Sequence, residues 1–140
     1  GGKIGLQRVG SLTEMTATSF FPSKPLGCYG DGGCVFVQDE AIAQKIRSLR
    51  AHGAGEHRYD HVYVGLNSRL DSLQAAILLE KLKIFDGELE RRHEIANLYA
   101  KHLQDIVTIP QCNQPFSSAY GLYTIRVPKE QRDGLCALLK

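Results

Sequence analysis

The chain has 140 residues, of which 43% are hydrophobic and 23% charged, and its formal net charge is +2. This composition is typical of a folded globular protein and excludes disorder as the default state. Basic residues form no cluster, and no apolar run is longer than the five residues at 75–79, which are too few to cross a bilayer. We therefore expect neither nucleic acid nor a membrane as a partner.

The beginning of the chain predicts two strands joined by a loop. Residues 1–15 are Gly-rich and irregular, whereas residues 16–21 are rich in β-branched and aromatic types and predict a short strand that stops at Pro22. Four glycines and two prolines in residues 22–33 allow no regular element there. Residues 34–38 are apolar almost throughout, which predicts a strand covered on both faces.

A helix is expected to begin at Asp39 or Glu40, because apolar residues recur at helical spacing as far as residues 52–53. Residues 54–61 are polar and predict a connection. Residues 62–64 predict a third extended piece.

A long helical pattern begins at Ser68 and continues to Leu103, with apolar residues at intervals of three, four and seven. Ser68 and Asp71 resemble a capping box, which predicts the start of the helix. Gly87 lies inside the pattern and allows a bend or a break.

The end of the chain mixes extended and helical patterns. Residues 106–110 look extended, residues 111–118 form a loop, residues 120–127 predict a strand and residues 129–140 predict a final helix. The alternation of strands and helices predicts an α/β or α+β architecture. The strands are too few for a doubly wound domain of ordinary size, so both ends of the chain look cut.

The cysteines and histidines predict no metal site. The four cysteines form no CxxC pair and the chain has no export signal, so we expect free thiols in a reducing cytoplasm. His57 and His61 have a spacing that occurs among zinc ligands. The gap between Cys28 and Cys34 does not fit a zinc knuckle, however, and no second Cys/His cluster closes a site.

Lys24 is the residue that its chemical context singles out. Pro22 and Pro25 keep the backbone around it stiff and extended, so its amine is held in a defined place. A lysine amine in its neutral form can attack a carbonyl group and form an imine. A surface lysine in a turn is the plainer interpretation, and the residues alone leave both open.

Asn67, Ser68 and Arg69 stand at the expected start of the long helix. Unpaired N–H groups and the helix dipole favour an anion at such a place, and an arginine there can bind a carboxylate or phosphate. Capping residues occur at most helix starts, and such an arginine often forms a structural ion pair. The ordinary roles therefore remain open as well.

Two long motifs follow one another along the chain. The first is SFFPSKPLG at residues 19–27 with YGDGG at residues 29–33, and the second is GLNSRLDSLQAA at residues 65–76. Together they resemble the signatures of the DegT/DnrJ/EryC1/StrS family of pyridoxal-phosphate-dependent nucleotide-sugar aminotransferases. Residues 8–12 resemble the segment that precedes the lysine strand in that family, and the similarity covers about residues 3–103 and continues more faintly to the end of the chain.

The resemblance implies part of an aspartate-aminotransferase-type fold, of the α/β class, with pyridoxal 5'-phosphate as cofactor. Lys24 matches the lysine that forms an imine with the cofactor and later moves a proton. Ser19 matches the serine that binds the cofactor phosphate. Asn67 matches the asparagine that reaches the phosphate of the neighbouring subunit's cofactor, which implies a homodimer with shared active sites.

The implied reaction moves an amino group from glutamate to a keto group on a nucleotide-linked sugar. The motifs are most similar to members that act on 3-keto sugars, among them UDP-2-acetamido-3-keto-glucuronate in surface polysaccharide synthesis. Because a uronate carries a carboxylate, we expect Arg69 to bind this substrate.

Members of the family are far longer, and their other cofactor-binding groups lie upstream of these motifs. The resemblance therefore implies a fragment. Residues 1–105 would be the C-terminal part of the large cofactor-binding domain, including the long helix, and residues 106–140 the beginning of a truncated small domain. We expect this piece alone to be inactive, because the protein must tune the cofactor's chemistry.

Two alternatives accompany this interpretation. Related dehydratases have a histidine in place of the lysine, and Lys24 argues against that chemistry. A truncated product that dimerises without catalysis belongs to a different functional class.

Overall fold

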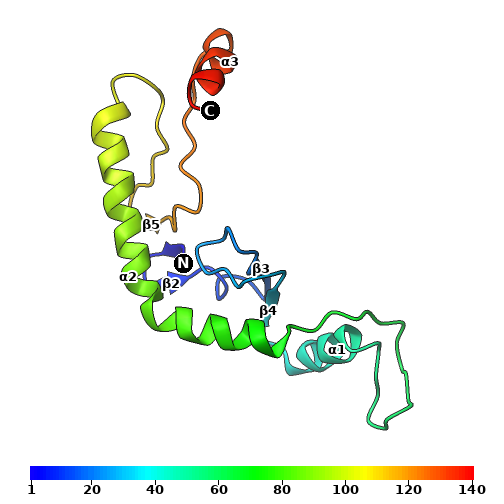
Figure 1. Cartoon of the computed structure of the whole chain (residues 1–140). Coiled ribbons are helices and arrows are strands. Elements are labelled where there is room, and N and C mark those ends of the chain that lie inside the picture. The colour runs from blue at the N-terminus through cyan, green and yellow to red at the C-terminus, as the bar shows by residue number, and fades with distance from the viewer.

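The computed structural model describes all 140 residues and contains both helices and strands (Figure 1). The helices are α1 (Glu40–Arg50), α2 (Ser72–Leu103) and α3 (Lys129–Leu138). The strands are β1 (Lys3–Ile4), β2 (Gln7–Arg8), β3 (Met15–Ser19), β4 (Gly33–Val37) and β5 (Phe116–Ser117). The expected mixture of α and β elements is confirmed.

β3 and β4 form a two-stranded antiparallel sheet in which Met15 lies opposite Val37 and Ser19 lies opposite Gly33. Both strands agree with the predicted ones to within two residues at each end. Their β-branched and apolar residues therefore predict the local structure correctly.

A smaller sheet with the strand order β2-β1-β5 joins the beginning of the chain to a later segment. Its strands have two residues each, too few to leave a periodic signal, and the sequence predicts an irregular start instead. Gly5, at a φ of +58°, allows the turn between β1 and β2. Arg8 of β2 forms an ion pair of 2.8 Å with Asp86, which ties this sheet to α2.

Few side chains of this chain are buried, and most of those lie on α2. The buried hydrophobic residues are Cys28, Leu78, Phe85, Leu89 and Ala96. The expectation that the strand at 34–38 is covered on both faces is wrong for this chain. Val35 and Phe36 point to opposite faces of the sheet, yet they are 42% and 48% exposed, because no packed layer fully covers either face of this two-stranded sheet.

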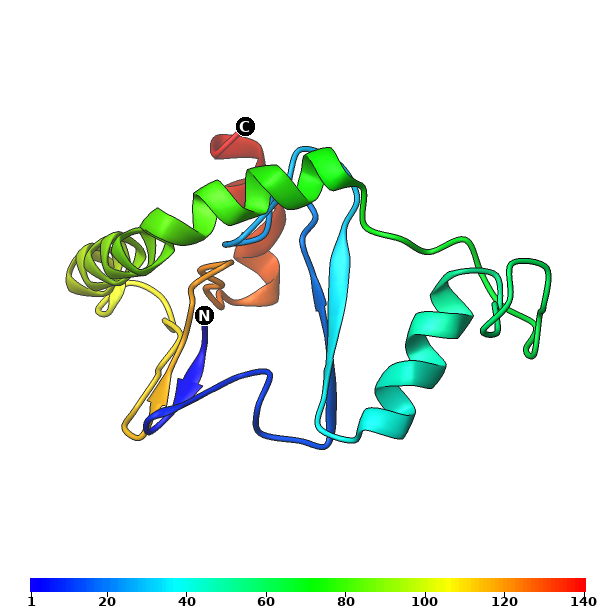
Figure 2. The same cartoon turned by 90° about the horizontal axis from the view of Figure 1, so that it is seen from below.

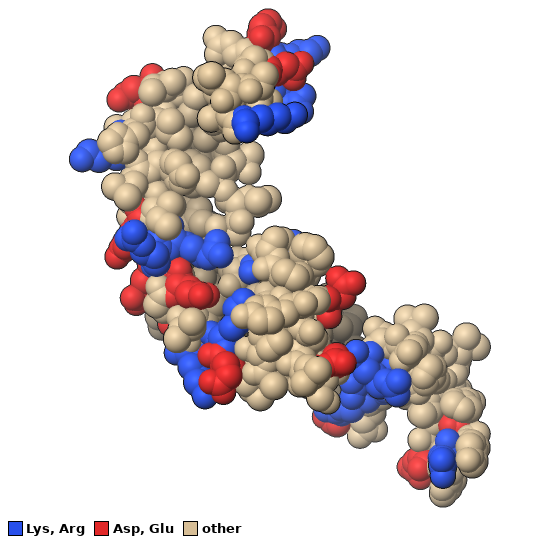
Figure 3. Space-filling view, in the orientation of Figure 1, with Lys and Arg blue, Asp and Glu red and all other residues tan.

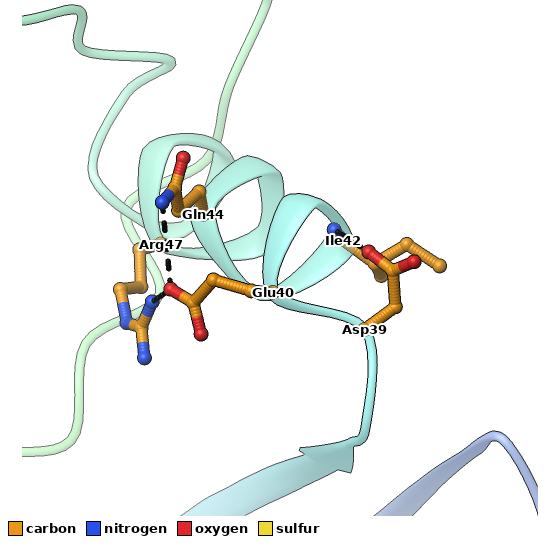
Figure 4. Close-up of polar contacts among 5 residues, drawn as sticks. All are labelled: Asp39, Glu40, Ile42, Gln44 and Arg47. Atoms are coloured by element: carbon orange, nitrogen blue, oxygen red, sulfur yellow. Dashed lines mark hydrogen bonds and ion pairs between the residues drawn. The ribbon is translucent and has the colours of Figure 1, made fainter.

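Helix α1 begins where the sequence predicts, because Asp39 caps it (Figure 4). The Asp39 Oδ1 accepts a hydrogen bond of 2.9 Å from the backbone N–H of Ile42. Along the helix, Glu40 Oε1 accepts hydrogen bonds from Arg47 at 2.9 Å and from Gln44 at 3.5 Å. These local contacts explain why the start of α1 can be read from the sequence.

The segment after α1 is a long connection that projects beyond this helix in both views (Figures 1 and 2). α1 ends at Arg50, two residues earlier than expected, and His52 has a left-handed φ of +65°. A single antiparallel bridge joins Ala54 to His61. Residues 62–64 form no strand, so the third extended piece is not a regular element.

Helix α2 begins at Ser72, and the start expected at Ser68 is wrong. The carboxylate of Asp71 caps the helix by accepting a backbone hydrogen bond of 2.7 Å. The N–H of Ser68 instead donates a hydrogen bond of 2.8 Å to the Arg50 carbonyl, which keeps this segment out of the helix. α2 continues past Gly87 without a break and is bent along its length (Figures 1 and 2).

The last part of the chain returns along α2 and ends in α3. The helix predicted at 129–140 is confirmed, but the strand expected at 120–127 is wrong, and residues 106–110 pair with that segment only through one isolated bridge. Aromatic packing holds the segment on α2, with the ring centroids of Tyr99 and Tyr123 5.1 Å apart. Side-chain packing thus replaces the expected strand pairing.

No helix in this structure has both the length and the apolar character that crossing a bilayer requires. On the face seen in Figure 3, acidic and basic side chains are interspersed, with broad uncharged areas between them.

Candidate active site

Lys24 lies in the loop that follows β3, and its side chain is exposed. Its backbone N–H donates a hydrogen bond of 2.8 Å to the Phe21 carbonyl, which closes a tight turn through Pro22. Its side-chain amine takes part in none of the ion pairs in the structure. The amine is therefore free of competing charged partners.

The Lys24 loop, residues 22–33, is closed by contacts with Phe20 at the end of β3. The Phe20 N–H donates a hydrogen bond of 2.7 Å to the Gly32 carbonyl, and the Phe20 carbonyl accepts one of 2.8 Å from the Cys28 N–H. The Cys28 side chain is wholly buried, and its Sγ lies 3.0 Å from the carbonyl oxygens of Phe20 and Gly30. The two ends of the loop are therefore held together.

Helix α2 holds the same loop from its other side. Lys81 Nζ donates a hydrogen bond of 2.6 Å to the Gly27 carbonyl, and Gln74 Oε1 accepts one of 2.7 Å from the Tyr29 N–H. Neither of these two helix residues was expected from the sequence to have a functional role. Gln74 lies inside the second motif, which is a usable signal, whereas nothing in the sequence distinguishes Lys81 from other lysines of the helix.

Ser19 is the last residue of β3 and is exposed. Its Oγ accepts a hydrogen bond of 3.2 Å from the Phe21 N–H. A hydroxyl group that accepts in this way keeps its own proton to donate. Ser19 can therefore offer an O–H group to an anion at the beginning of the Lys24 loop.

Asn67 and Arg69 lie in an extended segment before α2 and not at its N-terminus. Asn67 pairs with Ala51 in an isolated antiparallel bridge, and the helix begins only at Ser72. The expected contribution of the helix dipole to these residues is therefore wrong, because that field falls off within the first turn. Arg69 Nη2 donates a hydrogen bond of 3.0 Å to Asn67 Oδ1, which leaves the Asn67 amide N–H groups and the other guanidinium N–H groups for further partners.

Asn67 and Arg69 line an open groove of about 1160 Å³ between the β3–β4 sheet and α1. Cys34 of β4 lines the same groove, and burial raises the pKa of its thiol. Neither Ser19 nor Lys24 lines it. Thr18, which precedes Ser19, and residues 31–33 of the Lys24 loop do line the groove, so the groove reaches this loop without including Ser19 or Lys24.

All four cysteines are unpaired, and the structure contains no group of three or more His, Cys, Asp or Glu side chains that could hold a metal ion. In the connection after α1, His61 Nδ1 lies 3.1 Å from the His52 carbonyl oxygen. This histidine therefore has a structural contact within its own loop.

Comparison with known proteins assigns the whole length of the chain to one protein family. The model of the DegT/DnrJ/EryC1/StrS aminotransferase family matches residues 1–140. UDP-2-acetamido-2-deoxy-3-oxo-D-glucuronate aminotransferase from Pseudomonas aeruginosa is 46% identical over 131 residues, which cover 93% of this chain and 36% of that protein.

Solved structures of similar proteins have the same fold over this segment. A DegT DnrJ EryC1 StrS aminotransferase from Brucella abortus matches with a TM-score of 0.93 and 47% identity, over 99% of this chain and 36% of that one. NtdA from Bacillus subtilis, with bound cofactor PMP, matches with a TM-score of 0.84 and 27% identity, over 92% of this chain and 31% of that one. The chain therefore spans about a third of the length of these similar proteins.

Proposed function

Because this chain belongs to the DegT/DnrJ/EryC1/StrS aminotransferase family, we propose that it is part of an enzyme that moves an amino group from glutamate to a keto group of a nucleotide-linked sugar. Pyridoxal 5'-phosphate is the cofactor in this proposal. The observation that carries it is the Lys24 amine, which has no charged partner and stands on a loop held at both ends. Residues 1–105 belong to the large cofactor-binding domain in this proposal, and residues 106–140 begin the small one.

The donor groups of this chain fit the chemistry of the cofactor. Pyridoxal phosphate presents an aldehyde and a phosphate. The free amine of Lys24 suits the aldehyde, and the Ser19 O–H and the Asn67 amide N–H groups suit the phosphate, because anions bind best to such donors. PMP, which the similar NtdA structure holds, is the aminated form of the same cofactor.

When bound, pyridoxal phosphate supplies the electron sink that transamination needs. Lys24 Nζ has two tasks in our proposal, since it holds the cofactor and then, as a neutral amine, takes up and delivers a proton. Ser19 and Asn67 hold the phosphate and thereby orient the cofactor toward this amine. The contacts that hold the Lys24 loop keep the backbone of this residue in place while Nζ moves between these tasks.

We propose that two subunits share each active site. Lys24 and Ser19 of one subunit would be completed by Asn67 and Arg69 of the other. Asn67 and Arg69 line the groove whereas Ser19 and Lys24 of the same chain do not, and this difference supports the arrangement.

The substrate in our proposal is a 3-keto sugar with a carboxylate, UDP-2-acetamido-3-keto-glucuronate. The 46% identity to an aminotransferase named for that sugar supports this choice. Arg69 is exposed and uses one N–H group on Asn67, so its guanidinium keeps donors for a carboxylate. The four free cysteines support a reducing compartment, and we propose the cytoplasm.

Borohydride reduction of the full-length protein with pyridoxal phosphate tests the role of Lys24, with the label located by peptide mass spectrometry. We expect the label on Lys24. Lys24→Ala should lose it and should slow the half-reaction with glutamate by about 1000-fold or more. Lys45→Ala and Lys101→Ala are the matched controls and should change neither signal, whereas retention of both signals in Lys24→Ala would disprove the role.

Subunit mixing tests the shared site. One subunit carries Lys24→Ala and the other carries both Asn67→Ala and Arg69→Ala, and we expect each parent dimer to be inactive. A shared site predicts that mixing restores activity, because one of the two sites in the mixed dimer regains all its groups. No recovery, with subunit exchange verified, would show that these residues act within their own chain.

A dimerising module without catalysis is the second candidate, favoured by the span of about a third of the similar proteins. We expect the 140-residue chain alone to be inactive as an aminotransferase. If it still retains a reduced label on Lys24 after dialysis, it binds the cofactor without the rest of the enzyme. If it dimerises and retains none, the module is the better description of this chain.

A further inference from the structure

Two polar side chains of α2 contact the Lys24 loop on either side of its buried cysteine. Lys81 Nζ donates to the Gly27 carbonyl at 2.6 Å, and the Tyr29 N–H donates to Gln74 Oε1 at 2.7 Å. Lys81 Nζ also lies 5.8 Å from the centre of the Tyr29 ring, within cation–π range. The helix thus contacts both neighbours of Cys28.

These contacts come from one face of the helix. Gln74 and Lys81 are seven residues apart, which is about two helical turns, so their side chains project in nearly the same direction. The loop runs beside the first half of α2 in both views (Figures 1 and 2). Two turns of one rigid element therefore hold the same short stretch of backbone.

The position of the Lys24 amine depends on this backbone. Since the Lys24 side chain is exposed and has no ion-pair partner, the loop backbone alone fixes the point from which this side chain reaches out. We propose that Lys81 and Gln74 are positioning residues: they fix residues 27–29 on α2 and so keep the Lys24 amine in place to meet the cofactor. This inference rests on the proposed function and adds two residues to it.

Lys81 should matter more than Gln74. Gly27 is buried, so its carbonyl loses its charged donor and gains no water when Lys81 is shortened or made apolar. The Tyr29 contact is exposed, and water can replace Gln74 there. We therefore expect a larger loss of loop stability when Lys81 is replaced than when Gln74 is replaced.

The experiment compares four variants with the unchanged full-length protein: Lys81→Met, Lys81→Arg, Gln74→Leu and Lys83→Met. Lys83 lies on the same helix and pairs with Glu80 at the surface, so Lys83→Met is a matched loss of charge away from the loop. The first readout is amide hydrogen exchange of residues 20–33 without cofactor. The second is the rate at which pyridoxal phosphate can be trapped on Lys24 with borohydride, together with kcat and KM for glutamate.

We expect Lys81→Met to speed exchange of the loop and to slow trapping on Lys24 by about 10- to 100-fold, with a matching loss in kcat and little change in KM. Lys81→Arg should restore most of both signals, Gln74→Leu should give a smaller loss, and Lys83→Met should give none. Normal trapping and kcat in Lys81→Met would overturn the positioning role. If the unchanged protein traps the cofactor on a residue other than Lys24, the proposed function itself fails, and faster loop exchange in Lys81→Met would still show that Lys81 anchors the loop.

Discussion

The Lys24 loop and the β3–β4 sheet are neighbours in the chain, yet they differ greatly in how well the rest of the chain packs against them. The loop has no regular structure, but it buries Cys28 entirely and is held by two side chains of α2. The sheet pairs regularly over five residue pairs, but Val35 and Phe36 are almost half exposed on its opposite faces. Regular backbone pairing and complete packing are therefore separate properties.

The difference follows from where the partners of each region lie. The loop is completed by Phe20 and by α2, all within this chain. A sheet of two strands is marginal alone and needs further layers on its faces. The chain spans only 36% of a similar aminotransferase. Within this span the Lys24 loop has its packing partners, whereas the sheet has no layers that fully cover its faces.

Among the changes that compare these two regions, Gly27→Ala is expected to have the largest effect on stability. A Cβ at this position would lie 2.6 Å from the Pro22 carbonyl oxygen and 2.7 Å from that of Phe21, so the backbone of the Lys24 loop must shift. We expect a loss of about 1–3 kcal/mol in the free energy of unfolding, measured by urea titration of the full-length protein. Gly87→Ala is the control: a Cβ there meets nothing within 4 Å on α2, and the change should stabilise the helix by about 0.5–1 kcal/mol. Equal effects of the two changes would mean that the loop is loosely packed.

Thiol labelling compares the two regions directly, because Cys28 lies in the loop and Cys34 in the sheet. Cys28 is wholly buried, so it reacts only when the loop opens, and we expect it to react about 100-fold or more slowly than the exposed Cys112. Burial raises the pKa of the Cys34 thiol, so its reaction should increase at a higher pH than that of an ordinary thiol. Labelling with an alkylating reagent, followed by peptide mass spectrometry, measures all three rates. Fast labelling of Cys28 would show that the loop is no better held than the sheet.

The exposed sheet should cause the 140-residue chain to associate with itself. Val35, Phe36 and Met15 are each more than 40% exposed, and apolar patches of this kind seldom stay uncovered. Phe36→Glu should therefore weaken the association by about tenfold, the order of one lost apolar contact. Light scattering over a range of concentrations measures this change, with Leu122→Glu, an exposed position outside the sheet, as the control. A monomeric unchanged chain at high concentration would contradict the prediction.

Loss of the exposed ion pair between Arg8 and Asp86 of α2 should have the smallest effect on stability. This effect is the reference with which the loss of the part-buried Lys81 contact can be compared. The hydrogen bond and the charge of Arg8 lower the pKa of Asp86 below its usual range. A lowered pKa in the folded state adds stability above the usual pKa of the carboxyl group, and this stability is lost as the pH falls through the lowered value. Asp86→Asn should therefore reduce the thermal midpoint slightly at pH 7, less in high salt, and not at all at pH values below the lowered pKa. A large effect at neutral pH would show that this pair is not an ordinary surface contact.

Much of the local structure can be predicted because its causes are local. Asp39 caps α1 by accepting a hydrogen bond from an N–H only three residues further along the chain, and Pro22 and Pro25 exclude regular structure around Lys24. The start of α2 cannot be predicted in this way, since Ser68 has the residue type of a helix cap but donates to Arg50 across the connection. The same reason explains why Asn67 and Arg69 were expected at a helix end and lie in an extended segment instead.

The sequence by itself determined the two strands of the sheet, the helices α1 and α3, the place of Lys24 in an irregular loop, and the family resemblance of the motifs. Only the tertiary structure decided that α2 begins at Ser72, that β4 keeps both faces open, and that Gln74 and Lys81 hold the loop. The physical reason is the distance along the chain between the residues that interact. Caps, prolines and hydrophobic periodicity act within a few residues, whereas a lysine that donates to a carbonyl 54 residues away leaves no pattern in the sequence around it.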